Sequence, residues 1–282
     1  MPAVPSDPLL PLADSFIPRF SRTFEQSVLR LRESVSEALV QADLEAGLLS
    51  DPERLMRLVS RIEIAKAESN VYAELVAAAA KAEVGRRPLR EAMTVQSPFV
   101  QRAAQRLSAQ MVRGVKDETR RAIRQIVFEA IRDGDPPARS QWLIRQIVGL
   151  TERDAVAVKR LAENGMSERQ VARYSQRLLR ARAMNIARTE TIRAGNVGRV
   201  EGWKQMQRDG LLAPDFQERW MVTYDDRLCE RCAPMDGLTV SLGGRFEETA
   251  RGVLPSERVP VSGVTTDTPP LHPQCRCTLV AA

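Results

Sequence analysis

Five side chains that can ligate a metal lie in two short clusters near the C-terminal end of the chain. The first cluster is Cys229-x-x-Cys232, and the second is His272-Pro-Gln-Cys275-Arg-Cys277. Together they contain all four cysteines and the single histidine of the 282 residues. Thiolate and imidazole are preferred zinc ligands, and a closed structural site needs four of them. The spacing therefore predicts a structural zinc site made by four of these five residues, with the choice among the five left open.

Disulfide bonds and redox chemistry are the alternatives for these cysteines. Four cysteines allow two disulfides, but residues 1–20 contain Pro and Asp rather than the apolar run of a secretory signal, which favours a reducing compartment. Thiols stay free there, and paired Cys/His motifs are then more often metal sites. No strand-helix unit of the thioredoxin type follows Cys232. The patterns of zinc hydrolases and deaminases are also absent, so the predicted metal is structural rather than catalytic.

Apolar residues at helical spacing predict the elements that precede the clusters. Residues 1–13 are rich in proline and are predicted to be extended. A helix is predicted next, because apolar residues recur there at steps of three and four, namely Phe16, Phe20, Phe24, Val28, Leu31, Val35 and Leu39. Asp51-Pro52 joins a capping residue to a proline at the first helical position and predicts a second helix that ends near residue 82. Glycine and prolines in residues 85–98 predict a boundary.

The middle of the chain is predicted to be helical as well. A long helix over residues 99–132 is stopped by the sequence Asp-Gly-Asp-Pro-Pro. Thr151 and Ser167 are capping residues, each followed three positions later by a polar partner, and they predict the starts of two further helices. The second of these leads into a helical stretch that Asp209-Gly210 ends.

Short strands are predicted after this helix. Residues 219–224, 238–240 and 277–280 are rich in aromatic and β-branched residues, whereas residues 243–270 are rich in proline and glycine and predict a long loop. A loop of that length is uncommon unless something fixes its ends, and a metal between the two clusters would do so. The chain is therefore predicted to be α+β, with a mostly helical N-terminal two thirds and a small helix-plus-β module that carries the metal knuckle.

Positive charge is concentrated in the helical middle. Residues 102–199 contain 21 Lys or Arg against 10 Asp or Glu, a net charge of +11, whereas residues 223–282 contain 6 against 8, a net charge of −2. Clustered cations bind phosphate, so weak, sequence-indifferent DNA binding is expected. Aromatic residues for base stacking are scarce there, and an Arg-rich helix face is more often simply solvated. No uncharged run approaches the length of a membrane span, so a protein without membrane contact is expected.

The helix before the clusters and the clusters themselves carry a further set of motifs. The helical run is Ile186-Ala187-Arg188-Thr189-Glu190-Thr191-Ile192-Arg193-Ala194, followed by Asn196, Gly198, Arg199, Glu201 and Lys204. The later motif residues are Trp220, Asp225, Arg227, Cys229, Cys232, Asp236, Gly237 and the stretch from Pro269 to Cys277. In this order, over roughly residues 150–282, they resemble the phage Mu F-like head morphogenesis family, whose members are also called minor head or minor capsid proteins.

The resemblance implies a structural protein of a tailed-phage or prophage head. Such a protein is made in the bacterial cytoplasm and built in few copies into the procapsid, with the portal protein and other capsid or scaffold proteins as partners, and sometimes travels with the DNA. It implies no catalytic residue, no small-molecule substrate and no enzyme domain after Cys277. The expected division is a helical region for partner contact at 1–98, a basic connector at 99–150 and the Mu F-like module at 151–282. The alternative is a DNA-associated zinc protein of regulatory or repair type.

Polar residues of the motif helix need a separate interpretation. Glu190 and Arg193, like Asn196 and Arg199, are three apart and share a helix face. We interpret them as a buried polar ladder that docks the helix against the cysteine module. A catalytic Glu190 is the weaker alternative, because no nucleophile, second carboxylate or histidine lies at a motif spacing from it. Asp225 and the acid beside it are interpreted as turn formers rather than cation ligands.

Overall fold

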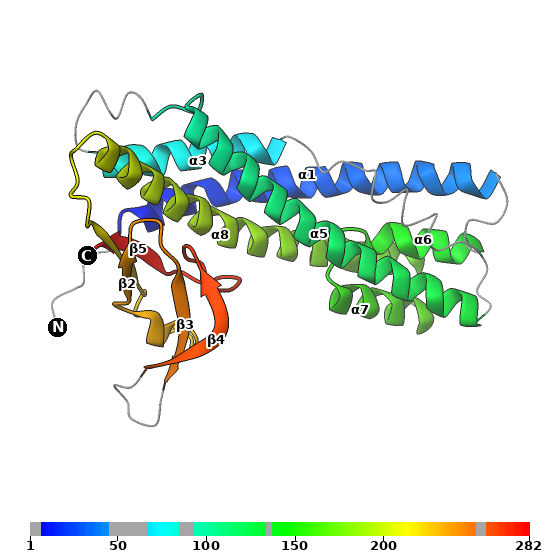
Figure 1. Ribbon diagram of the computed structural model, residues 1–282. Helices are drawn as coiled ribbons and strands as arrows, with labels where there is room; N and C mark the ends of the chain where they lie inside the picture. Colours follow the sequence, from blue (N-terminus) through cyan, green and yellow to red (C-terminus); the bar gives the residue numbers. More distant parts are fainter. Residues whose placement is uncertain (1–6, 45–66, 85–92, 134–136, 252–257) are drawn as a thin grey trace. The chain divides into compact units, whose positions relative to one another are not determined.

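The computed structural model describes residues 7–44, 67–84, 93–133, 137–251 and 258–282 (Figure 1). It confirms the α+β prediction, since a helical N-terminal part precedes a small strand region. The helices are α1 (Leu9–Leu44), α3 (Ala67–Glu83), α5 (Pro98–Asp133), α6 (Pro137–Ile147), α7 (Glu152–Glu163) and α8 (Glu168–Arg208). They are followed by β1 (Gln217–Met221), the short 3-10 helix η2 (Ala233–Met235), β2 (Thr239–Ser241), β3 (Phe246–Arg251), β4 (Arg258–Thr266) and β5 (Thr278–Ala281). No helix in these ranges has the length and apolar character needed to cross a membrane.

The chain divides into two compact units, each assembled from segments that are distant in sequence. The first contains Met1–Phe20, Ser69–Leu107 and Asn185–Ala282, and the second contains Ser21–Glu68 and Ser108–Met184. Helices α1, α5 and α8 contribute residues to both units. The three-part division of roles along the sequence stays a prediction.

The start of the first helix differs from the prediction. Residues 9–13 are helical rather than extended, because Asp7 Oδ1 accepts the Leu9 N–H at 3.0 Å and so caps α1. The predicted stripe is confirmed from Phe20 to Val35, whose members are nearly inaccessible to solvent. The second predicted helix is confirmed over Ala67–Glu83, and its expected start at Asp51 lies outside the described residues.

Local capping explains two helices of the second unit. Thr151 Oγ1 accepts the Asp154 N–H at 3.2 Å and starts α7, as the sequence predicts. Gln170 Oε1 accepts both the backbone N–H and the hydroxyl of Ser167 at the start of α8. Buried Arg182 donates to the Gly149 carbonyl at 2.7 Å and pairs with Glu118, so part of the unit's positive charge is neutralised internally.

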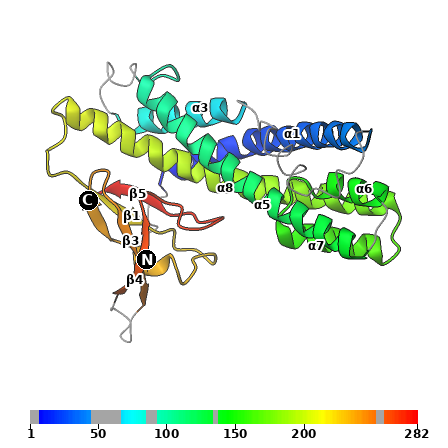
Figure 2. The same ribbon diagram turned by 45° about the vertical axis from the view of Figure 1, so that its right-hand side comes forward.

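Two small sheets form the β part of the first unit. The antiparallel order β2-β1-β5 places Arg219 opposite Thr239 on one side and Val280 on the other. Figures 1 and 2 show this sheet beside the C-terminal half of α8. The predicted loop over 243–270 is wrong, because β3 and β4 pair there as a second antiparallel sheet. Side-chain alternation in β3, with Phe246 buried, and several valines in β4 outweigh the prolines and glycines of this stretch.

Two glycines of the motif helix allow close packing of α3 on α8. A Cβ atom at Gly198 would lie 2.5 Å from the Val76 carbonyl oxygen and 2.8 Å from Ala79 Cβ. A Cβ atom at Gly202 would lie 3.1 Å from the Ala80 carbonyl oxygen. The helix backbones therefore approach more closely than any side chain at position 198 would permit.

Gly198→Ala is expected to lower the free energy of unfolding by about 2 kcal/mol, because the added methyl group forces α3 and α8 apart. Gly114→Ala is the matched control, since α5 offers open space there with nothing within 4 Å of the new Cβ. That control is expected to gain about 0.5–1 kcal/mol from reduced chain entropy. Urea unfolding measures both, and equal effects of the two substitutions would contradict the close packing.

Candidate metal centre

Two turns of the first unit carry the five predicted ligands. The turn after β1 holds the first cluster, where the Cys232 N–H donates to the Cys229 carbonyl at 3.1 Å and η2 follows directly. The second turn enters β5, and there the Cys275 N–H donates to the His272 carbonyl at 3.2 Å. Gln274 adopts a positive φ of 64°, which folds the second turn tightly enough to present its side chains to the first.

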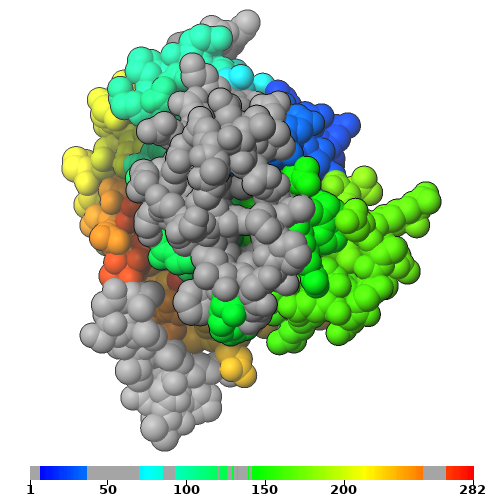
Figure 3. Space-filling model, turned by 90° about the vertical axis from the view of Figure 1, so that its right-hand side faces the viewer, coloured from blue at the N-terminus to red at the C-terminus, as the bar shows by residue number. Residues whose placement is uncertain are grey.

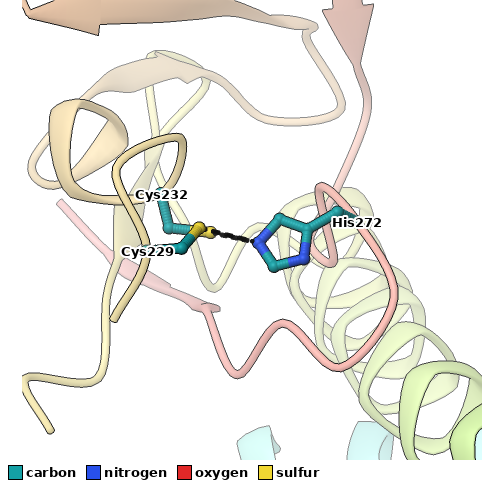
Figure 4. A group of neighbouring side chains, drawn as sticks. All are labelled: Cys229, Cys232 and His272. Atoms are coloured by element: carbon teal, nitrogen blue, oxygen red, sulfur yellow. Dashed lines mark hydrogen bonds between the residues drawn. The ribbon is translucent and has the colours of Figure 1, made fainter. Parts of the chain in front are cut away.

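The structure brings the ligand atoms of both clusters together. His272 Nε2 lies 3.0 Å from Cys229 Sγ and 3.1 Å from Cys232 Sγ (Figure 4). Cys232 Sγ lies 3.6 Å from Cys275 Sγ. The ligand atoms form two triplets, and within each triplet they all lie within 4.8 Å of one another. One triplet is Cys229, Cys232 and His272, and the other is Cys232, Cys275 and Cys277. Cys232 thus belongs to both triplets and lies at the centre of the site.

The five residues form a small, partly open cage that could hold a metal ion. All four cysteines are free thiols, so the disulfide alternative is not what the structure holds. The five predicted ligands line one small cavity of about 20 Å³, which is close to the space of a single water molecule or ion. Cys232, Cys275 and Cys277 are buried, and only part of Cys229 and His272 meets solvent. A cage of this size has room for one ion.

Shared hydrogen bonds polarise the thiols. Hydrogen bonds from the Cys232 and Cys277 thiols lower the pKa of Cys275 far below its ordinary value. The same hydrogen bond to Cys275 raises the pKa of Cys232. Metal ligation requires thiolates, so a metal ion that binds the cluster must displace the thiol protons that remain.

Helix α8 holds the backbone of the second cluster through Thr189 and through Asn196 of the predicted ladder. Thr189 Oγ1 accepts the Gln274 N–H at 3.0 Å. Asn196 Oδ1 accepts the Leu279 N–H at 2.9 Å, while its Nδ2 donates to the Cys277 carbonyl at 3.3 Å. The interpretation of the motif helix as a dock for the cysteine module is confirmed at Asn196, which is fully buried.

Glu190 differs from the predicted ladder. Its carboxylate accepts the Tyr72 hydroxyl at 2.7 Å and pairs with Arg193 at 3.1 Å, so it joins α8 to α3 rather than to the cysteine module. Burial raises the pKa of this carboxyl, and the Arg193 charge and the Tyr72 hydrogen bond oppose the shift.

Buried Arg199, the last residue of the predicted ladder, connects α8 to two other segments of the chain. Its guanidinium donates to both Asp7 oxygens at 2.7 Å, to Glu83 at 2.6 Å and to the Leu279 carbonyl. Burial raises the pKa of Asp7, but the Arg199 hydrogen bonds outweigh burial and hold it below its ordinary value. Sequence reasoning missed Asp7 and Glu83, and only the position of Asp7 before Pro8 signalled a helix cap there.

Asp225 behaves as a turn former, as the sequence predicts. Its Oδ1 accepts the Arg227 N–H at 3.0 Å, and its carboxylate pairs with Arg276 between two of the ligands. The Thr223 hydroxyl donates to the Arg276 carbonyl at 2.9 Å. These contacts join the first turn to the second.

A second buried acid was not anticipated from the sequence. Glu218 on β1 is fully buried, and neither of its carboxylate oxygens has a hydrogen-bond partner among the described residues. Burial raises its pKa to about 7, although the Gly243 backbone amide and the nearby Lys204 charge oppose the shift. The pKa of Glu218 is higher in the folded chain than in the unfolded chain, where it is about 4.5. The contribution of Glu218 to the free energy of unfolding is therefore fully present below about pH 4.5 and is lost as the pH rises through about 7.

Glu218→Gln is expected to be more stable than the original chain at pH 8 by up to roughly 3 kcal/mol, and this advantage should shrink near pH 5. The amide has the shape of the protonated acid but never ionises. Urea unfolding at both pH values measures the difference, with the substitution Glu247→Gln at an exposed position of β3 as the control. An advantage that does not change with pH would show that Glu218 does not titrate in this range.

Comparison with known proteins gives the chain a family. Neither the curated proteins nor the solved structures contain a significant match to it. The model of the family described as Phage Mu protein F like protein matches residues 121–280, which include α8 and both ligand clusters. Since this match covers more than half of the 282 residues, the chain belongs to the phage Mu protein F-like family.

Proposed function

We propose that the protein is a minor head protein of a tailed phage or prophage, built into the procapsid with the portal protein. The observation that carries this proposal is the family match over residues 121–280, since the family indicates a phage head morphogenesis protein. The protein acts in the assembling head and the virion through contacts with the portal and other capsid or scaffold proteins. Its role is structural rather than enzymatic, in keeping with a motif helix whose polar residues join helices and turns.

The cage holds one structural zinc ion through Cys229, Cys232, His272 and Cys275. Three thiolates and one imidazole form a closed tetrahedral set with no open position for a substrate. Cys277 is the thiol left over, and its backbone N–H donates to Cys275 Sγ at 3.5 Å, an outer contact that stabilises a metal-bound thiolate. Zinc fastens the two turns to each other and replaces some of the apolar core that a small sheet cannot provide.

Asn196→Ala is expected to weaken zinc binding about 10–100-fold, because the second turn loses the two hydrogen bonds that fix its backbone. Competition with a chromogenic chelator measures the affinity, and elemental analysis should first give about one zinc per original chain. Asn185→Ala, on the same helix and next to no ligand, is the control. Equal zinc affinity in the two variants would contradict a positioning role for Asn196.

Contact with DNA is secondary in this proposal. Several cations of the basic stretch are engaged by acids, as in Lys159 with Glu129 and Arg180 with Glu25. The protein is therefore expected to bind DNA only weakly. This binding should fall steeply as the salt concentration rises and should not distinguish unrelated duplexes. A strong preference for one sequence would instead favour the DNA-associated regulatory protein.

Head assembly with the full chain tests the function. The tagged protein, produced with the other head genes of the same phage or prophage, should co-sediment with procapsids and be retained in purified particles. A full chain is necessary because Asp7 and Glu83 pair with Arg199, so deletion of the N-terminal residues would also disturb the zinc module. Absence of the protein from particles that assemble normally would refute the proposed role.

A further inference from the structure

A groove on the second compact unit lies outside the metal centre. It is lined by residues of α7 and the first turns of α8 and by the connection between them, namely Leu161, Met166, Gln170, Arg173, Tyr174 and Arg177. Its volume is about 500 Å³. In Figure 3 the light-green atoms of this part of the chain lie at the surface on the right of the view. Met166 is 38% exposed, although large apolar side chains are usually covered.

The rim of the groove carries two positive charges that no acid among the described residues neutralises. Arg173 and Arg177 are one helical turn apart and exposed, and neither forms an ion pair with another described residue. Arg180 and Arg182, farther along the same helix, are paired with Glu25 and Glu118. Within the described ranges, the residues that line the groove include no acid.

Tyr174 gives the groove an ordered apolar wall. The Arg177 guanidinium carbon lies 5.0 Å from the centroid of the Tyr174 ring, a cation–π distance that holds both groups in place. Arg, Tyr and Met are enriched in protein interfaces, because their side chains offer large contact areas together with polar groups. Apolar residues beside two arginines of fixed spacing therefore form a surface that a protein segment can recognise.

We propose that this groove binds an acidic amphipathic segment of another head protein. One apolar side chain of that segment packs against Leu161, Met166 and Tyr174, and carboxylates beside it pair with Arg173 and Arg177. A guanidinium binds a carboxylate through two parallel hydrogen bonds, which sets the register of the segment. Duplex DNA would use the arginines but not the apolar wall, and an open groove does not enclose a small ligand as a dedicated pocket does.

Charge reversal in the full chain tests this contact, which rests on the proposed function. Arg173→Glu with Arg177→Glu is expected to reduce the number of copies per purified particle by about tenfold, because the partner's carboxylates are then repelled. The matched control is Arg169→Glu with Arg208→Glu, which changes the net charge equally at exposed positions of α8 outside the groove. Circular dichroism and zinc content should be unchanged in both, and Arg173→Gln with Arg177→Gln should give a smaller loss.

A photo-crosslinking residue at position 166 identifies the occupant. The expected product is a peptide of another head protein with at least two carboxylates near the crosslink, and reversal of those acids to Lys should restore incorporation of the Arg173→Glu, Arg177→Glu chain. The inference is overturned in favour of a general charge effect if the Arg173→Glu, Arg177→Glu chain and the Arg169→Glu, Arg208→Glu chain lose equal numbers of copies per particle. Crosslinks to DNA overturn it as well. If the Arg173→Glu, Arg177→Glu chain enters particles at the level of the original chain, this inference alone is overturned. If the original chain is absent from particles, the proposed function is overturned as well.

Discussion

Cys232→Ser is expected to abolish zinc binding and to unfold the strand region after residue 216. Cys232 Sγ is the atom shared by both ligand triplets, so its loss removes the link between the two turns. Serine is a poor zinc ligand, and the free energy of metal binding contributes directly to the stability of a module that folds around its metal. The loss is expected to be several kcal/mol, with zinc content falling from about one per chain to near zero.

Elemental analysis and limited proteolysis measure these two effects. Cleavage should appear in the strand region, while the helices of the second unit stay protected. Cys277→Ser is the matched control, because Cys277 is buried beside the site but is not one of the four proposed ligands, and it should retain zinc. A Cys232→Ser chain that keeps a full zinc ion, or a Cys277→Ser chain that loses it, would contradict the ligand assignment.

Arg199→Ala is expected to lower the free energy of unfolding by about 3–5 kcal/mol. The substitution removes the two hydrogen bonds that Arg199 donates to the buried Asp7 carboxylate, the ion pair with Glu83 and the hydrogen bond to the Leu279 carbonyl. Arg19→Ala is the control, because its ion pair with Glu74 is largely exposed and such pairs contribute about 0–1 kcal/mol. Urea unfolding at neutral pH measures both variants.

The pH dependence of stability gives a second measure of this cluster. Arg199 holds the pKa of Asp7 in the folded chain below its ordinary value. The stability that Asp7 contributes is therefore fully present when the pH is above the ordinary pKa of an aspartate, and it is lost as the pH falls through the pKa of Asp7 in the folded chain. Asp7→Asn should therefore weaken the chain at neutral pH and show a smaller further loss on acidification. An Arg199→Ala chain as stable as the Arg19→Ala chain would show that the buried pair adds nothing.

Local chemistry explains what the sequence by itself determined. The ligand types and spacings of Cys229, Cys232 and His272 depend on tight turns, which short segments specify, and the structure places these three together. Capping at Thr151 and the apolar stripe of α1 are likewise properties of neighbouring residues. The motif helix and its dock at Asn196 were anticipated because polar residues at a spacing of three share one helix face.

Only the tertiary structure decided which distant residues meet. Asp7 and Arg199 are 192 positions apart, and neither position has a local pattern that names the other. Glu190 was expected to face the cysteine module but lies against Tyr72, because the close approach of α3 at Gly198 brings that hydroxyl to it. Within the predicted loop, Phe246–Arg251 and Arg258–Thr266 form a sheet, because strand pairing is set by a partner strand and a buried face, which composition does not report.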